Sequence, residues 1–134
     1  MVQSIFKAYD IRGYYPEEIN ARTVEEIATA LGRHFPAGSI VLGHDGRTSS
    51  PALAFATARG LALTRPRSAV VDIGVCTTPM FYFLVNNLRA AGGVMVTASH
   101  NPRAMNGLKV VGRGAVPLSG TDVKKLMHRP HASA

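Results

Sequence analysis

Two kinds of apolar segment follow one another along this chain. In one kind the apolar residues are spaced as on one face of a helix, and in the other they are continuous, as in a buried strand. Helical spacing predicts an amphipathic helix at residues 22–35, and further helices are expected at the alanine-rich stretch 52–63 and at 78–88. Apolar runs of strand length lie at residues 39–43, 69–73 and 93–97. Strands that alternate with helices of about 10 to 15 residues favour βαβ units with parallel strands and right-handed crossovers. The pattern therefore predicts an α/β fold.

A fourth apolar run, at residues 108–111, follows Asn106-Gly107, a dipeptide typical of tight hairpin turns. We therefore expect this strand to be antiparallel to the third, with a last helix at residues 121–127. The expected architecture is a three-layer α/β/α sandwich with a mixed, mostly parallel four-stranded sheet whose last strand is antiparallel. Residues 5–9 are expected to be extended and to lead into a loop at 10–13, and residues 128–134 to form a disordered tail.

Polar residues at the expected helix starts predict how three helices begin. Thr23 and Glu26 have the spacing of a capping box, in which each side chain satisfies a free backbone N–H. Ser50 is a candidate N-cap with Pro51 in the first helical position, and a threonine–proline pair at residues 78–79 begins the next helix.

The third predicted strand ends at a serine on a turn. The chain becomes small and polar through Ser99, and Asn101-Pro102 stops the strand because proline fixes φ and lacks a donor. Lys109 then starts the returning strand. A serine on such a turn is exposed while the sheet holds its backbone, as a nucleophile or a phosphoryl carrier requires. The same residue types also form ordinary hairpin loops, so the local pattern leaves both interpretations open.

Two arginines lie where they could serve a site near that serine. Arg12 is either a surface charge or a fork for a phosphate, and Gly13 beside it allows close backbone approach. Arg47 follows the first strand, and we hypothesise that it braces the serine loop from the neighbouring strand end. In an open α/β sheet, ligands bind beyond the carboxyl ends of the strands, where Arg47, Thr77 and Ser99 all lie.

Three further residues invite a chemical interpretation. His44 and Asp45 could bind a metal, but the sequence offers no further ligands nearby, so hydrogen bonds within the loop are favoured. Cys76 is the only cysteine, which excludes an internal disulfide and favours a reducing compartment. Its place at a strand end favours a buried, small apolar side chain over a reactive thiol.

Composition and charge narrow the class of protein. With 134 residues, 46% of them hydrophobic, the chain is long enough for one globular domain with its own core. Its formal net charge of +7 would attract phosphate-bearing partners. The basic residues are scattered and no nucleic-acid motif is present, so DNA or RNA binding is not favoured. No stretch resembles a membrane span or a leader, so we expect a cytoplasmic protein.

Two longer segments carry a resemblance to a known family. Residues 97–102, Thr-Ala-Ser-His-Asn-Pro, together with Asn-Gly-Leu-Lys at 106–109, resemble the active-site serine loop of the α-D-phosphohexomutases, the phosphomannomutase/phosphoglucomutase family. Residues 6–13, Phe-Lys-Ala-Tyr-Asp-Ile-Arg-Gly, resemble the signature at that family's amino terminus. The resemblance runs from Phe6 to Lys125 and covers the first of the family's four domains, which we assign to residues 1–127.

The resemblance implies an isomerase that moves a phosphoryl group between carbons 1 and 6 of a hexose. Ser99 would be the phosphoserine: it would phosphorylate a hexose monophosphate and regain a phosphoryl group from the resulting bisphosphate. The implied catalytic residues are Ser99, His100, Lys109 and Arg12, and the implied contacts to the phosphosugar are Tyr9, Arg12, Asn101 and Lys109. Mg²⁺ would be shared by the phosphate on Ser99 and an aspartate-rich loop.

Several elements of that family are missing from these 134 residues. There is no Asp-x-Asp-x-Asp loop for magnesium, no Gly-Glu-x-Ser sugar loop and no carboxyl-terminal phosphate loop, so a preference for glucose or mannose is not encoded here. Ser119-Gly120-Thr121 is similar to part of the phosphate loop, but Pro117 and Val123 replace its flanking arginine and proline. We interpret Ser119 as the N-cap of the last helix. Met105 stands where an aromatic residue is frequent.

Two functions follow from these patterns. In the first, the chain is the serine domain of a phosphohexomutase, with hexose phosphates and the remaining mutase domains as partners, and it is inactive by itself because one ligand cannot hold Mg²⁺. In the second, it is a non-catalytic phosphate-binding or interaction module that keeps the serine loop. The face that would dock a second domain is expected to expose apolar residues, which predicts weak self-association.

Overall fold

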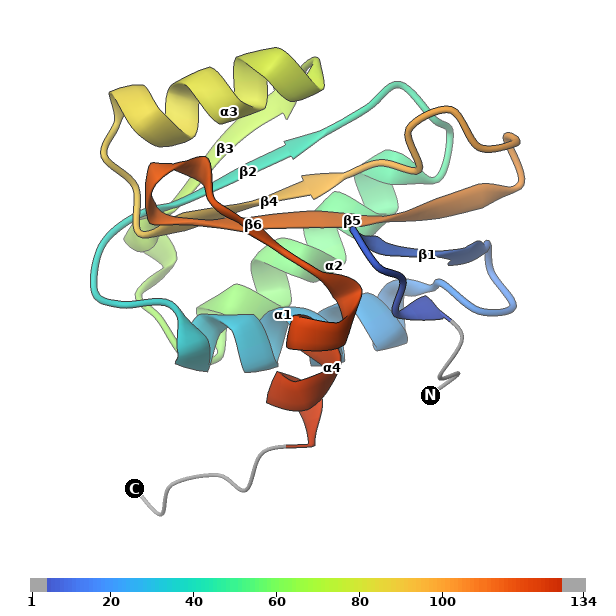
Figure 1. Cartoon of the computed structure of the whole chain (residues 1–134), viewed down its shortest axis with the longest axis horizontal. Coiled ribbons are helices and arrows are strands. Elements are labelled where there is room, and N and C mark those ends of the chain that lie inside the picture. The colour runs from blue at the N-terminus through green and yellow to red at the C-terminus, as the bar shows by residue number, and fades with distance from the viewer. Residues whose placement is uncertain (1–4, 129–134) are drawn as a thin grey trace.

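A computed structural model describes residues 5–128, which form a mixed β-sheet with helices on both faces (Figure 1). The strands of this described part are β1 (Ile11–Tyr14), β2 (Ile40–His44), β3 (Val70–Val75), β4 (Gly92–Val96), β5 (Met105–Gly112) and β6 (Pro117–Leu118). Their order across the sheet is β1-β5-β4-β2-β3, with β6 paired to β5. Strands β3, β2 and β4 are parallel to one another, whereas β5 is antiparallel to β4, as the sequence predicted.

The described residues also form four α-helices and two short 3₁₀ helices, and the last α-helix follows the last strand. The helices are α1 (Ala21–His34), α2 (Ser50–Ala62), α3 (Thr78–Asn87), α4 (Gly120–Met127), η2 (Arg67–Ala69) and η3 (Arg113–Ala115). Helices α1, α2 and α4 lie on one face of the sheet, and α3 lies on the other (Figure 1). The predicted α/β class and its three layers are therefore confirmed.

The two faces of the sheet bury two separate cores because strand side chains alternate in direction. Toward α1 and α2, a large cluster contains Leu42, Val94 and Leu108 from the strands. Toward α3, a smaller cluster contains Met95 and Val111 with residues of that helix. This alternation also determines on which face each polar strand residue lies.

The sheet has more strands than the sequence predicted. Six strands are present in the described chain instead of four. The two additional strands both pair antiparallel with β5: β1 with its first half and β6 with its second half. The segment 10–13, expected as a loop, is mostly strand β1. Short edge strands that contain arginine and glycine carry no clear apolar alternation, and β1 is stabilised by a partner that lies more than 90 residues away in the sequence.

The predicted turn at Asn106-Gly107 is wrong. Both residues lie inside β5 and are buried, and the chain turns earlier, between β4 and Met105. Gly107 faces Arg12 across the β1–β5 pair, and a Cβ atom at Gly107 would collide with the carbonyl oxygen of Ile11. Glycine is thus required here by the close approach of two strands rather than by a turn.

Two helix starts also differ from prediction by a few residues. Helix α1 begins at Ala21, and Asn20 is its N-cap, with its side chain accepting a hydrogen bond from the Thr23 amide at 3.0 Å. The capping box of Thr23 and Glu26 was therefore wrong. Ser50 was predicted to be the N-cap of α2. The helix instead begins at Ser50, so its N-cap is Ser49, one residue earlier.

The other two predicted helix starts are confirmed. Helix α3 begins at Thr78, with Pro79 in its first turn and Thr77 as its N-cap. Ser119 caps α4 in a complete capping box with Asp122, so its similarity to a phosphate loop reflects helix capping.

Of the predicted tail at 128–134, residues 129–134 lie outside the described part of the chain, and His128 is the C-cap of α4. Among the helices of the described residues, none has the length and apolar character that crossing a membrane requires.

Candidate active site

Ser99 lies just beyond the carboxyl end of a central strand. Strand β4 ends at Val96, Thr97 and Ala98 remain buried, and Ser99 and His100 are exposed. The backbone of Ser99 has a φ of 56°, in the left-handed region that L-residues other than glycine, asparagine and aspartate seldom adopt. Its amide donates a hydrogen bond to the Thr97 hydroxyl at 3.0 Å. The serine side chain is thus presented to solvent from a locally ordered backbone.

The connection from β4 to β5 is a compact turn, which we call the serine loop (residues 97–105). Asn101 closes its first half, because both its amide and its side-chain nitrogen donate to the carbonyl of Ala98, at 3.0 and 2.7 Å. The Met105 amide closes its second half by donating to the Pro102 carbonyl at 2.9 Å. Residues 97–105 therefore have defined positions although several of their side chains are exposed.

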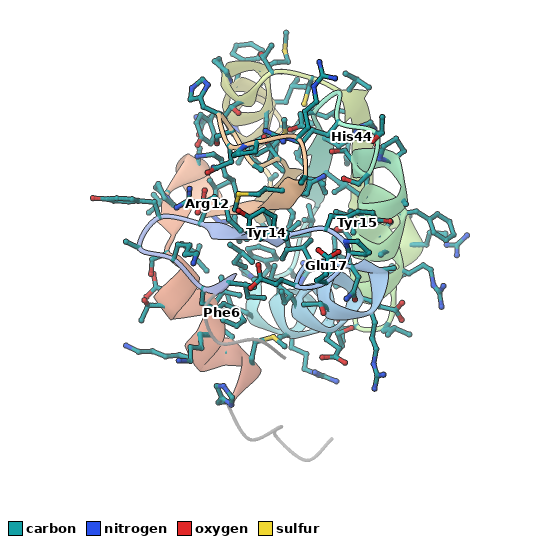
Figure 2. The ribbon with its side chains drawn as sticks, turned by 90° about the vertical axis from the view of Figure 1, so that its right-hand side faces the viewer. Phe6, Arg12, Tyr14, Tyr15, Glu17 and His44 are labelled. Carbon is teal, nitrogen blue, oxygen red and sulfur yellow. The ribbon has the colours of Figure 1, made fainter. Side chains whose placement is uncertain are left out.

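Arg12 approaches this loop from the edge strand β1. Its Nε forms an ion pair with Asp10 at 2.8 Å, and its Nη1 donates to the side-chain oxygen of Asn101 at 3.2 Å. Strands β2 and β4 run toward the right of Figure 1, and Figure 2 looks at that end, where Arg12 and His44 are labelled. The fold thus joins the two sequence segments that carried the family resemblance.

Lys109 lies on the same face of the sheet as Arg12. Its neighbours in β5, Leu108 and Val110, belong to the core beneath α1 and α2, so Lys109 lies on the opposite face. Arg12 follows Ile11, another residue of that same core, and its partner in the strand pair is Gly107, two residues before Lys109. Two cations therefore share the face that borders the serine loop.

Arg47 contacts the serine loop directly, as hypothesised. It follows β2, and its guanidinium donates hydrogen bonds to four backbone carbonyls of the loop, those of Ser99, Asn101, Pro102 and Met105. Its Nε also forms an ion pair with Asp45 at 3.2 Å.

Asp45 is the acceptor at the centre of a polar network beneath the loop. It accepts hydrogen bonds from the Arg47 amide and from the Ser50 hydroxyl, which in turn accepts one from Asn106. Burial by itself would raise the pKa of the Asp45 carboxyl, but the bonds from Ser50, the Arg47 amide and Thr97 outweigh it, and the net pKa is lowered. Asp45 therefore stays ionised at neutral pH.

These contacts explain the His44-Asp45 pair without a metal. His44 Nδ1 lies 2.9 Å from the carbonyl of Asp45, and among residues 5–128 no three His, Cys, Asp or Glu side chains gather as a metal site would require. The loop hydrogen bonds favoured from the sequence are present.

Cys76 is half-buried rather than fully buried, with its sulfur 3.6 Å from that of Met95. Burial raises the pKa of the Cys76 thiol above its usual range, as does the charge of Asp72, while a backbone hydrogen bond to His44 opposes them. The thiol is consequently protonated at neutral pH and a poor nucleophile.

The structure brings some of the expected site residues together and leaves others at the surface. Arg12, Asn101 and the Ser99 backbone are linked through the loop, whereas Tyr9 is 85% exposed and His100 is also exposed. The supporting residues that sequence reasoning missed are Asp10, Ser50 and Asn106. The sequence carried no signal for the role of Asn106, which was assigned to a turn; its full burial, which requires polar partners, is visible only in the structure.

Known mutases match the chain over nearly its whole length. A family model described as phosphoglucomutase/phosphomannomutase, alpha/beta/alpha domain I, matches residues 3–132. A protein of Xanthomonas campestris pv. campestris (strain B100) named "Phosphohexose mutases" is 49% identical over 119 residues, which cover 89% of this chain and 26% of that protein. The phosphomannomutase of Salmonella typhimurium (strain LT2) is 44% identical over 125 residues, covering 90% of this chain and 27% of that protein.

A solved structure agrees with these sequence matches. The crystal structure of a phosphoglucomutase/phosphomannomutase family protein from Burkholderia thailandensis is similar with a TM-score of 0.84 and 38% identity, over 96% of this chain and 30% of that one. The chain spans only 26% and 27% of the length of the two relatives above. Sequence and fold together show that the chain belongs to the phosphoglucomutase/phosphomannomutase family and carries its α/β/α domain I.

Proposed function

We propose that this chain is the phosphoserine-bearing domain of a phosphohexomutase. The observation that supports this most directly is the presentation of Ser99, exposed in a left-handed conformation at the end of a central strand while its loop is tied down on both sides. Phosphoryl transfer depends mainly on positioning and on cations near the phosphoryl oxygens, and Arg12 and Lys109 lie on the adjoining face.

The proposed reaction has two transfers that mirror each other. In the first, a hydroxyl oxygen of a hexose monophosphate forms a bond to the phosphorus on Ser99, the bond from phosphorus to the serine oxygen breaks, and the sugar hydroxyl gives up its proton. In the second, the Ser99 oxygen attacks the other phosphate of the bisphosphate and releases the isomeric monophosphate. Ser99 ends as it began, and no external phosphate is consumed.

The remaining residues take the following roles in this proposal. Lys109 and Arg12 offset the charge of the transferring phosphoryl group, and His100 holds or accepts the proton. Tyr9, Arg12, Asn101 and Lys109 contact the phosphosugar. Arg12 uses two of its five N–H donors on Asp10 and Asn101, so the others can donate to a bound phosphate.

Magnesium is part of the proposal, but the described residues do not by themselves fit a magnesium site. Mg²⁺ prefers several oxygen ligands in octahedral geometry, and no cluster of acidic side chains lies near Ser99 in residues 5–128. When bound, the ion would neutralise phosphoryl charge. We propose that phosphorylated Ser99 supplies one ligand and that the others come from domains that the longer relatives possess.

A domain replacement tests this function. The matching first quarter of the Salmonella typhimurium phosphomannomutase would be exchanged for this chain, and the chimera assayed for conversion of glucose 1-phosphate and mannose 1-phosphate to the 6-phosphates, with Mg²⁺ and a hexose bisphosphate. We expect turnover by the chimera, none by the isolated chain, and none by the Ser99→Ala chimera. Ser68→Ala, which changes an exposed serine in η2, is the matched control and should keep full activity.

The alternative is a non-catalytic module that binds phosphate or a partner. It requires only the exposed serine loop and the cations Arg12 and Lys109 on the adjoining face. A well-folded chimera without turnover would support the alternative, whereas a chimera whose activity survives Ser99→Ala would contradict the proposed phosphoserine role of Ser99. Intact mass after incubation with the bisphosphate adds an independent readout, because the mutase proposal requires one phosphoryl group on Ser99.

A further inference from the structure

We propose that Arg47 is a positioning residue that holds the serine loop in its reactive conformation and that it does not itself contact the phosphosugar. The inference rests on the proposed function of Ser99, but the contacts that carry it belong to the chain alone. Arg47 lies 52 residues before Ser99, on a different strand end, and its side chain is only 14% exposed.

Every N–H group of the Arg47 guanidinium has a partner. Its Nε donates to Asp45 at 3.2 Å, and its two terminal nitrogens donate twice each to the serine loop. The four acceptors are the backbone carbonyls of Pro102 (2.7 Å), Met105 (3.2 Å), Ser99 (3.0 Å) and Asn101 (2.7 Å). A guanidinium has five N–H donors, so none is left for a phosphate. Arg47 can therefore act on the chemistry only through the loop.

The loop needs such a partner because its carbonyls converge. Residues 99–105 turn sharply, and Ser99 takes a backbone conformation that is unfavourable for an L-residue. Four carbonyl oxygens of the loop point toward the same place, where no neighbouring strand of the described chain supplies N–H donors. The planar guanidinium of Arg47 donates to all four at once. Without it, the carbonyls would turn toward water, and Ser99 would be free to leave the left-handed region.

Arg47 is itself held on three elements of the fold. Asp45, just after β2, accepts hydrogen bonds from the Nε and the amide of Arg47, and another from the hydroxyl of Ser50 in α2. Asn106 of β5 donates to Ser50 at 3.0 Å and is fully buried. The loop is thus supported by groups whose own positions are determined by packing, which is the arrangement that keeps a reactive side chain in place.

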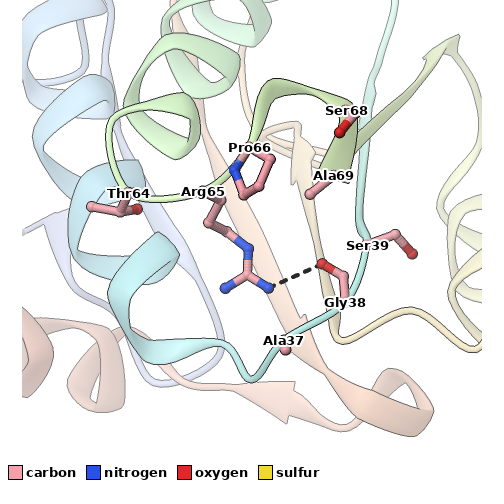
Figure 3. Close-up of a pocket in the computed structure, with 8 residues that line it drawn as sticks. All are labelled: Ala37, Gly38, Ser39, Thr64, Arg65, Pro66, Ser68 and Ala69. Carbon is pink, nitrogen blue, oxygen red and sulfur yellow. Dashed lines mark hydrogen bonds between the residues drawn. The ribbon is translucent and has the colours of Figure 1, made fainter.

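The chain contains a matched control for this arrangement. Arg65 also donates to four backbone carbonyls, those of Gly32 in the last turn of α1 and of Phe35, Pro36 and Gly38 after that helix. Figure 3 shows Arg65 beside a hollow lined by residues that precede β2 and β3, at the amino ends of these strands and so opposite to the serine loop. The terminal nitrogens of Arg65 bond four carbonyls as those of Arg47 do, although its Nε is buried without a hydrogen-bond partner among the described residues, and Arg65 has no route to Ser99.

Hydrogen exchange on the chain itself is the first test, and it needs no enzymatic activity. Lysine keeps the charge of Arg47 but cannot bond four carbonyls at once. In Arg47→Lys we expect the amides of Ser99, Asn101 and Met105 to exchange about tenfold faster, while those of β4 are unchanged. Arg65→Lys should speed exchange near the end of α1 and leave the serine loop as it was. Unchanged exchange in the serine loop of Arg47→Lys, or faster exchange throughout the chain, would overturn the proposal.

The kinetic test uses the chimera with the Salmonella domains. A displacement of a reacting group by about 1 Å can cost about 100-fold in rate, so Arg47→Lys should lower kcat by about that factor with KM for the hexose phosphate nearly unchanged. Arg65→Lys should keep kcat. A raised KM with normal kcat would mean that Arg47 binds substrate, and a normal kcat despite a loosened loop would mean that the loop's order is not needed; either result contradicts the proposal.

Two further measurements separate the possible failures. Asp45→Asn removes the negative charge that pairs with Arg47 while keeping the shape of the Asp45 side chain. It should raise exchange in the serine loop and lower kcat, each by less than Arg47→Lys does. If the wild-type chimera shows no turnover, the proposed function fails, whereas the exchange result still decides whether Arg47 holds the loop.

Discussion

At the scale of single residues, the site depends on one strained backbone position and on the charges that surround it. A left-handed conformation costs an L-residue about 1–2 kcal/mol, and Ser99 adopts it at a φ of 56°. Hydrogen bonds from Arg47 to the loop carbonyls and from the Ser99 amide to Thr97 offset that cost. The position of the hydroxyl is therefore set by its backbone, which side chains elsewhere in the fold support.

The charge of Asp45 gives this network a defined dependence on pH. Because the folded-state pKa of Asp45 is lowered, its carboxylate stabilises the fold fully above the unfolded pKa, about 3.9, and the contribution is lost as the pH falls through the lower folded value. We expect the free energy of unfolding of the wild type to fall more steeply than that of Asp45→Asn below about pH 4.

Urea unfolding at a series of pH values measures this difference. Glu17→Gln, which changes an exposed acid away from the serine loop, serves as the control and should follow the wild type. Parallel curves for Asp45→Asn and the wild type would show that Asp45 does not contribute through its charge.

At the scale of elements, helix α1 shows how the fold selects among competing capping signals. Asn20 and Thr23 are both polar residues near the start of this helix, but only Asn20 has the extended backbone of an N-cap. Its side-chain oxygen accepts from the Thr23 amide, and its side-chain nitrogen donates to the Pro16 carbonyl. Thr23 lies inside the first turn. The segment before α1, anchored by Ile19 in the core, decides where the helix begins.

We therefore predict opposite results for two alanine substitutions in this segment. Asn20→Ala removes the cap and should lower the free energy of unfolding by about 1 kcal/mol, whereas Thr23→Ala, at a helical position where alanine is favourable, should change it by only a few tenths. Urea unfolding of both variants measures the difference. A larger loss in Thr23→Ala than in Asn20→Ala would restore the capping box that the sequence indicated.

At the scale of the whole molecule, the chain exposes apolar residues beside the helix that lies alone on its face of the sheet. Met80 and Phe83 of α3 are 50% and 60% exposed, and Val75 at the end of the edge strand β3 is 71% exposed. The longer relatives have about three quarters of their length beyond the matched region. A face of this kind fits a docking surface for further domains and, in the isolated chain, for a second copy.

We expect weak self-association through this face, opposed by the net charge of +7. Salt screens that repulsion, so association measured by light scattering should increase with both protein and salt concentration. Phe83→Ser should reduce it, whereas Phe55→Ser, which changes an equally exposed phenylalanine of α2 on the other side of the sheet, should not. A monomer at millimolar concentration in high salt, or equal effects of the two substitutions, would contradict the assignment.

Local periodicity was enough to predict most elements of this fold. Apolar runs located strands β2, β3, β4 and part of β5, and helical spacing, an alanine-rich stretch and helix-starting residues located the four helices within a few residues. These signals all lie close together in the sequence. The start of α3 at Thr78-Pro79 and the N-cap of α4 at Ser119 were also predicted, since such helix-starting residues need no distant partner. The serine turn and the family were evident from contiguous residues.

Other features depend on residues that are far apart in the sequence. Strand β1 exists because Gly107 lets it approach β5, and the supposed turn at Asn106 is strand because that asparagine is bonded to Ser49 and Ser50. The contact between Arg47 and the serine loop could be hypothesised from strand ends, but its four hydrogen bonds to the loop could not. By itself, the sequence determined most of the elements and where the serine lies, since these depend on neighbours along the chain. Only the tertiary structure decided the edge strands and the partners that hold that serine in place, since these contacts form only when distant segments meet.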